Sequence, residues 1–69
     1  MWQATAYVLK DGDAQEVLRD VTRLVSVQGG IRLETFFEEP RVLPCRVAEI
    51  DFLRHTVALI PGDGAPEGG

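Results

Sequence analysis

Cys45 and His55 are the only thiol and the only imidazole in this 69-residue chain. A thiol and an imidazole can work as a nucleophile and its base if they share a hydrogen bond and a third group orients the base. Here the two residues are ten positions apart, and a predicted strand lies between them. Ser26, the only serine, lies inside a β-pattern with no neighbouring base. The sequence therefore predicts a protein that is not an enzyme.

The same two residues are the candidate metal ligands. A soft-metal site usually needs three or four Cys, His or carboxylate ligands, and this chain supplies one of each soft type. A symmetric dimer doubles that supply, but Cys45 and His55 then form a site only if both lie near the two-fold axis. In the simpler interpretation Cys45 is a small buried hydrophobe and His55 a solvated turn residue. The residues themselves predict no cofactor.

Two hairpins must position these side chains. Gly29 and Gly30 form a turn that accepts positive φ without a Cβ clash, and apolar residues alternate before and after it. Residues 49–59 repeat the pattern around a polar corner at Arg54 and His55, between a half-buried strand at 48–52 and a last strand at 56–60. The chain therefore carries two predicted hairpins, which indicates a curled sheet.

The remaining segments also read as strands. Residues 2–9 alternate, and Asp11-Gly12 follows as a turn. Residues 16–20 fit a short strand or one helical turn, and their brevity favours the strand. Further strands are expected at 21–27, 31–37 and 41–47; the last contains Pro44, which confines it to an edge, a strand start or a bulge.

These elements predict an all-β fold, a small antiparallel β-barrel or strongly bent sheet of five to six strands. Residues 1–60 form the single domain, and the glycine-rich residues 61–69 form a disordered tail. The expected core is Ala6, Val8, Val25, Val27, Ile31, Leu33, Phe37, Ile50, Phe52, Val57 and Leu59.

Composition narrows the function classes. Seven basic against eleven acidic residues give a net charge of −4, which argues against DNA or RNA binding through general phosphate attraction. No apolar run approaches the ~20 residues of a membrane span, and the start of the chain lacks a signal-peptide pattern. A single cysteine allows no disulfide within the chain. We therefore expect a cytoplasmic protein.

The short chain also predicts a homodimer. A domain of about 60 residues buries only about 60% of the surface that its unfolded chain exposes, so its core is thin. Trp2 on the first strand offers apolar surface, and Phe36 falls on a polar face beside Arg32 and Glu34. Phe36 is either a stacking surface or a cover for the barrel end or a partner subunit, and the cover is favoured. Trp2 and Phe36 are thus the predicted partner-interface residues.

Several short motifs occur in a recognisable order. They are Asp20-Val21, the Gly-Gly-Ile-x-Leu of residues 29–33, the Phe-x-Glu of residues 37–39, and the Glu-Ile-Asp-Phe-Leu-x-His-x-Val-x-Leu of residues 49–59. Together they resemble the CooT-like family of small bacterial and archaeal proteins, labelled nickel-binding or predicted RNA-binding. The resemblance implies an Sm-like or SH3-like β-barrel that forms homodimers.

The resemblance also implies a nickel site, from which this chain departs. Family members linked to carbon monoxide dehydrogenase maturation bind nickel through a cysteine directly after the initiator methionine, at the dimer interface. Here that position is Trp2, whose indole donates a hydrogen bond and cannot replace a thiolate. The favoured function is a non-catalytic dimeric accessory or scaffold protein in metalloenzyme maturation. The alternatives are an Sm-like RNA-binding module and a protein-interaction domain that uses a sheet edge.

Overall fold

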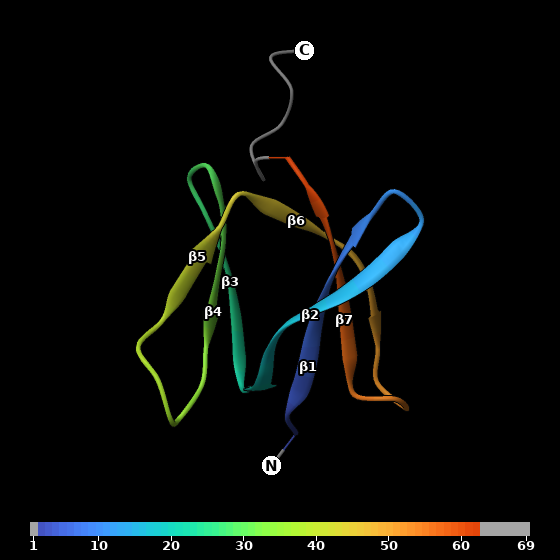
Figure 1. Cartoon of the computed structure of the whole chain (residues 1–69). Coiled ribbons are helices and arrows are strands. Elements are labelled where there is room, and N and C mark those ends of the chain that lie inside the picture. The colour runs from blue at the N-terminus through green and yellow to red at the C-terminus, as the bar shows by residue number, and fades with distance from the viewer. Residues whose placement is uncertain (1, 63–69) are drawn as a thin grey trace.

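Seven strands in two sheets make up the fold in the computed structural model, which describes residues 2–62. The strands are β1 (Ala4–Lys10), β2 (Asp13–Val21), β3 (Arg23–Val27), β4 (Gly30–Glu34), β5 (Arg41–Leu43), β6 (Cys45–Asp51) and β7 (Thr56–Pro61). One sheet has the order β2-β1-β7-β6 and the other β3-β4-β5 (Figure 1). The described residues form no helix that could span a membrane.

The all-β prediction is confirmed, but the barrel is not. The two sheets are not closed by a continuous hydrogen-bonded ladder. The strand count is seven because Thr22 and Pro44 each interrupt an extended segment that passes from one sheet to the other. All strand pairs are antiparallel except β1 with β7, which run parallel.

A strong bend in β2 carries the chain from the first sheet to the second (Figure 1). Its pairing with β1 is irregular at two places, and Asp20 adopts a left-handed φ of 59°. Bulges of this kind bend a strand and increase its twist. At the corner, the backbone N–H of Thr22 donates to the backbone oxygen of Glu34 at 2.8 Å. The hydroxyl of Thr22 donates to the same backbone oxygen at 3.2 Å. The corner is therefore fastened to β4.

The tight turns follow local chemistry. Asp11 and Gly12 both have positive φ, 52° and 82°, so the β1–β2 hairpin has the two-residue turn that Asp-Gly favours. The β3–β4 hairpin turns at Gln28 and Gly29, because Val27 pairs with Gly30. The predicted Gly29-Gly30 turn was therefore wrong by one residue, and Gly30 begins β4.

The core lies between the sheets and is built from small and branched apolar side chains. Its buried members are Ala4, Ala6, Leu18, Val21, Ile31, Leu33, Cys45, Val57 and Leu59. Five of the expected core residues are among them, and Val8, Val25 and Val27 are half-buried.

The expected core was wrong for Phe37, Ile50 and Phe52, which are 71%, 38% and 68% exposed. β4 ends at Glu34, so the alternation that placed Phe37 inside stops before that residue. Phe52 lies beyond the end of β6 in the turn to β7. Ile50 lies on the edge strand of its sheet, where the neighbouring sheet does not cover it.

The predicted tail falls mostly on residues 63–69, which lie outside the described residues. Before them, β7 extends to Pro61, and the backbone N–H of Gly62 donates to the oxygen of Pro44 at 2.9 Å.

Candidate functional site: the aromatic turn at Trp2

Trp2 packs onto the turn between β6 and β7. Its ring centroid lies 5.4 Å from that of Phe52 in a tilted arrangement, and its indole N–H donates to the Phe52 oxygen at 3.5 Å. On the same ring, His55 stacks with a centroid distance of 5.6 Å and an interplanar angle of 28°. We call Trp2, Phe52 and His55 the aromatic turn.

The β6–β7 connection presents these rings because its geometry is locally fixed. Asp51 pairs with Thr56, which leaves a four-residue turn between them. The Asp51 carboxylate accepts from the backbone N–H of Arg54 at 3.0 Å. His55 closes the turn with a left-handed φ of 55°. A polar corner at Arg54 and His55 was predicted, and the structure confirms it.

The parallel pairing of β1 with β7 brings Trp2 to this turn. Thr5 pairs with Thr56, and the backbone N–H of Thr5 donates to the oxygen of His55 at 2.9 Å. The Nδ1 of His55 lies 3.0 Å from the backbone oxygen of Gln3. Because a carbonyl only accepts, this contact assigns the proton to Nδ1. In the neutral ring, Nε2 then carries the lone pair.

Cys45 lies at the opposite end of the β6–β7 hairpin. It begins β6 and pairs with Pro61, whereas His55 lies beyond the pair of Asp51 and Thr56. At about 3.3 Å per residue, the six steps of β6 separate the two ends by about 20 Å. The side chain of Cys45 is buried, and burial raises the pKa of its thiol. The structure therefore does not bring Cys45 and His55 together as a nucleophile and base.

The groups at position 2 do not fit a nickel site. The aromatic turn supplies an indole donor, a backbone oxygen already engaged by His55 and a single imidazole lone pair, with no thiolate. Between residues 2 and 62, no three His, Cys, Asp or Glu side chains gather in an arrangement that could hold a metal ion. The described residues around Trp2 therefore do not supply the several thiolate or imidazole ligands that nickel coordination of this kind needs.

Phe36 lies in a different part of the molecule from Trp2. It sits in the connection between β4 and β5, next to Phe37, and is 64% exposed. The β4–β5 connection and the β6–β7 turn lie at the same end of the molecule, on its two opposite sides (Figure 1). The two predicted interface residues therefore lie in separate parts of the molecule, Trp2 half-buried and Phe36 exposed.

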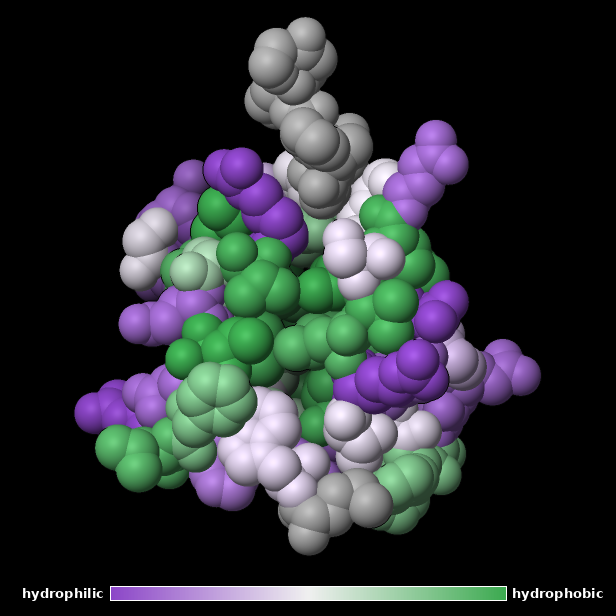
Figure 2. Space-filling view, turned by 180° about the vertical axis from the view of Figure 1, so that it is seen from behind, coloured by the Kyte–Doolittle hydropathy of each residue, from purple (hydrophilic) through white to green (hydrophobic). Residues whose placement is uncertain are grey.

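Sequence reasoning missed a further exposed apolar surface along β6. Val47 pairs with Leu59 and Ile50 with Val57, so both β6 residues point to the same side of the sheet as fully buried residues. Yet Val47 is 40% and Ile50 38% exposed. Apolar side chains gather across the middle of the face seen in Figure 2. Pro44 was the available signal, because an edge position was one of the three placements that it allowed for this segment.

Comparisons with known proteins agree with this fold. The sequence profile described as CO dehydrogenase accessory protein CooT matches residues 1–60. The crystal structure of a candidate CooT from Carboxydothermus hydrogenoformans superposes with a TM-score of 0.81 at 21% sequence identity, covering 88% of this chain and 98% of that one. No curated protein matches the chain. Because the family profile spans all seven strands except the last residue of β7, the chain belongs to the CooT family of CO dehydrogenase accessory proteins.

Proposed function

We propose that this protein is a non-catalytic, cytoplasmic homodimer that serves as an accessory or scaffold protein in CO dehydrogenase maturation without binding nickel at position 2. The observation that carries the proposal is the indole of Trp2, which packs on Phe52 and His55 at the position where the family resemblance implies a metal-binding cysteine. Packing at this position replaces coordination, while the family fold is kept.

The β6 surface supports the homodimer. Val47 and Ile50 continue the core-facing side of the first sheet into solvent, and a second copy provides the apolar cover that the second sheet does not. Phe52 and Leu53, 68% and 94% exposed, follow β6 directly in the chain and add further exposed apolar side chains. An apolar surface that is continuous with a core is typical of an obligate interface.

Trp2 and Phe36 have different interface roles in this proposal. Trp2 packs against Phe52 and so shapes the end of the dimer surface. Phe36, in the β4–β5 connection, is left for a partner outside the dimer. This division follows from the contact of Trp2 with the β6–β7 turn, which lies on the opposite side of the molecule from the β4–β5 connection (Figure 1).

Light scattering after size-exclusion chromatography tests the dimer. We expect twice the 7.6 kDa chain mass for the wild type and the monomer mass for Val47→Asp and Ile50→Asp, because each buries a charge in the interface. Val42→Asp is the matched control: Val42 is 58% exposed, and it pairs with Arg32 on the outer face of the second sheet. A wild-type mass of 7.6 kDa at micromolar concentration contradicts the homodimer.

The accessory role is tested with the CO dehydrogenase polypeptide itself. Biolayer interferometry with the immobilised wild-type protein should show saturable binding of the dehydrogenase and none of an unrelated metalloenzyme of similar charge. Calorimetry of the same preparation with Ni²⁺ should show no stoichiometric tight site. Failure to bind the dehydrogenase refutes the accessory role, and a tight nickel site refutes the reading of position 2.

A further inference from the structure

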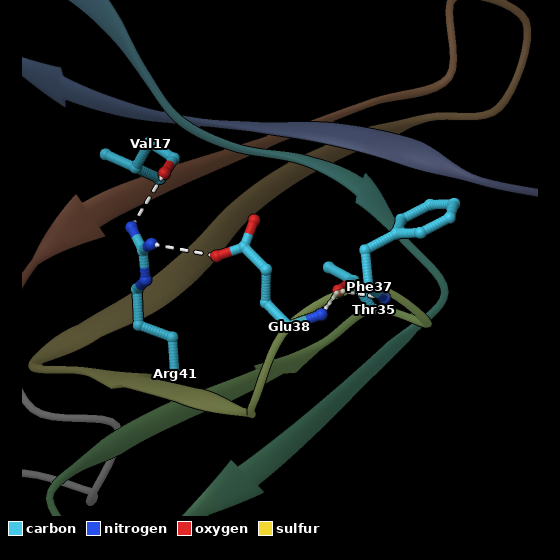
Figure 3. A network of polar contacts seen from close by, with 5 residues as sticks. All are labelled: Val17, Thr35, Phe37, Glu38 and Arg41. Atoms are coloured by element: carbon cyan, nitrogen blue, oxygen red, sulfur yellow. Dashed lines mark hydrogen bonds and ion pairs between the residues drawn. The ribbon is translucent and has the colours of Figure 1, made fainter.

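The connection between β4 and β5 holds two exposed phenylalanines in a fixed shape. Phe36 is 64% and Phe37 71% exposed. The hydroxyl oxygen of Thr35 accepts from the backbone N–H of Phe37 at 3.1 Å and from that of Glu38 at 3.0 Å (Figure 3). A threonine side chain that accepts from two following amides holds the backbone in one turn. The two phenylalanines are therefore not on a loose loop.

A second contact ties the same connection to the other sheet. The guanidinium of Arg41 donates to the backbone oxygen of Val17 at 3.0 Å and lies 3.5 Å from the Glu38 carboxylate (Figure 3). Val17 lies on β2 at one of its bulges. The connection belongs to the second sheet but is anchored on the first. Fixing a surface in advance lowers the entropy lost when a partner binds.

The charges beside the phenylalanines indicate which partner fits. Glu38 and Glu39 follow Phe37 directly, and among the described residues only Arg41 pairs with Glu38 while Glu39 has no ion pair. A symmetric contact with a second copy sets these acids against the same acids, in a chain of net charge −4. A surface with basic residues around an apolar centre instead complements both features.

We propose that Phe36 and Phe37 are the anchors of a docking surface for a different protein, which receives them on an apolar patch bordered by Lys or Arg. Thr35 and Arg41 are positioning residues for this surface. The chemistry of the surface is argued from this loop alone, while the identity of the partner as the dehydrogenase rests on the proposed function.

Peptide titrations followed by ¹H–¹⁵N NMR test the chemistry without the dehydrogenase. A peptide with two leucines flanked by lysines should shift the amide signals of residues 35–39, and a peptide with glutamates in place of the lysines should not. Phe36→Ser/Phe37→Ser should weaken the binding at least tenfold, and Val42→Ser, also at an exposed apolar residue of this sheet, should leave it unchanged. Equal shifts with both peptides, or shifts confined to other strands, overturn the proposal.

The positioning role has its own readout. Thr35→Val and Arg41→Gln should weaken the peptide binding about threefold or more while raising the amide mobility of residues 36–39 in NMR relaxation. Thr35→Ser keeps the accepting oxygen and should restore both values. Weaker binding with unchanged mobility contradicts preorganisation by Thr35 and Arg41.

Binding to the CO dehydrogenase polypeptide separates this inference from the proposed function. If the wild type and Phe36→Ser/Phe37→Ser bind the dehydrogenase equally, the docking surface is refuted and the accessory role stands. If neither binds it but the lysine peptide still binds residues 35–39, the accessory role fails and the docking chemistry stands. If the double variant becomes monomeric, the occupant is a second copy and the inference is overturned.

Discussion

The backbone of Gly30 at the start of β4 lies against the backbone oxygen of Leu43 at the end of β5, so closely that a Cβ at position 30 would overlap that oxygen. The next nearest atoms belong to the backbone of Leu43 and Pro44, which cannot swing aside as a side-chain end can. The absence of a side chain at Gly30 therefore lets the second sheet approach the corner where β5 passes into β6.

Gly30→Ala should lower the free energy of unfolding by about 1–3 kcal/mol, because the added methyl group has to push the backbone of β5 away. Urea unfolding at one fixed protein concentration measures the loss. Gly12→Asn is the comparison: Gly12 has open space around its Cβ position, so only the φ of 82° opposes the substitution. Asparagine is among the residues that adopt left-handed conformations most readily, so the loss for Gly12→Asn should be the smaller of the two. Equal stability of Gly30→Ala and the wild type contradicts the close approach.

Leu59→Ala should cost about 2–5 kcal/mol, because Leu59 is fully buried between the sheets. Phe37→Ala removes a larger side chain, but at 71% exposure it should change stability by less than about 0.5 kcal/mol. Thermal and urea unfolding of both variants give the comparison. A larger loss for Phe37→Ala than for Leu59→Ala is incompatible with the described core.

Trp2→Cys should create a nickel site, whereas we expect no tight nickel binding by the wild type. We expect the new thiolate to act together with His55, on which the Trp2 ring stacks and whose Nε2 carries the lone pair while Nδ1 is engaged by Gln3. Calorimetry and the thiolate-to-nickel charge-transfer band detect it. Trp2→Ser is the control without a thiolate, and Trp2→Cys/His55→Ala should bind more weakly than Trp2→Cys. A submicromolar site in wild-type protein that survives loss of both His55 and Cys45 contradicts this reading.

The buried thiol of Cys45 predicts a loss of stability at alkaline pH. Burial raises its pKa in the folded protein, so the folded state keeps the proton to a higher pH than the unfolded chain. The resulting contribution is fully present below the ordinary thiol pKa of about 8.5 and declines as the pH rises above it. Urea unfolding at pH 7.5 and pH 10 should show a decline that is smaller in Cys45→Ala, and the same decline in both proteins excludes the thiol as its source.

Local patterns in the sequence were sufficient to predict the strands that pair with the next strand along the chain. Ile31 and Leu33 alternate on a β-branched hairpin and are buried as predicted, and Asp11-Gly12 turns as its residue types require. The prediction that Phe37 is buried was wrong, and the reason is also local. The hydroxyl oxygen of Thr35 bonds to the following amides, so the chain leaves the strand two residues before the phenylalanine.

The aromatic turn could not be predicted, because it depends on which distant strands pair. The alternation of residues 2–9 correctly predicted a strand with Ala6 in the core, but it carries no information that β1 lies parallel to β7. Only that pairing sets Trp2 against His55. The exposure of Ile50 has a similar origin, since an edge position in a sheet is a property of the whole strand order.

The parallel pairing of β1 with β7 also determines when the chain can fold during synthesis. The β1–β2 hairpin is local and can form as soon as both strands have left the ribosome, but the other edge of β1 waits for residues 56–59. Pairings between such distant segments form slowly. Trp2 and β1 are therefore made well before the strand that completes their packing, and β1 keeps an open edge until residues 56–59 have been synthesised.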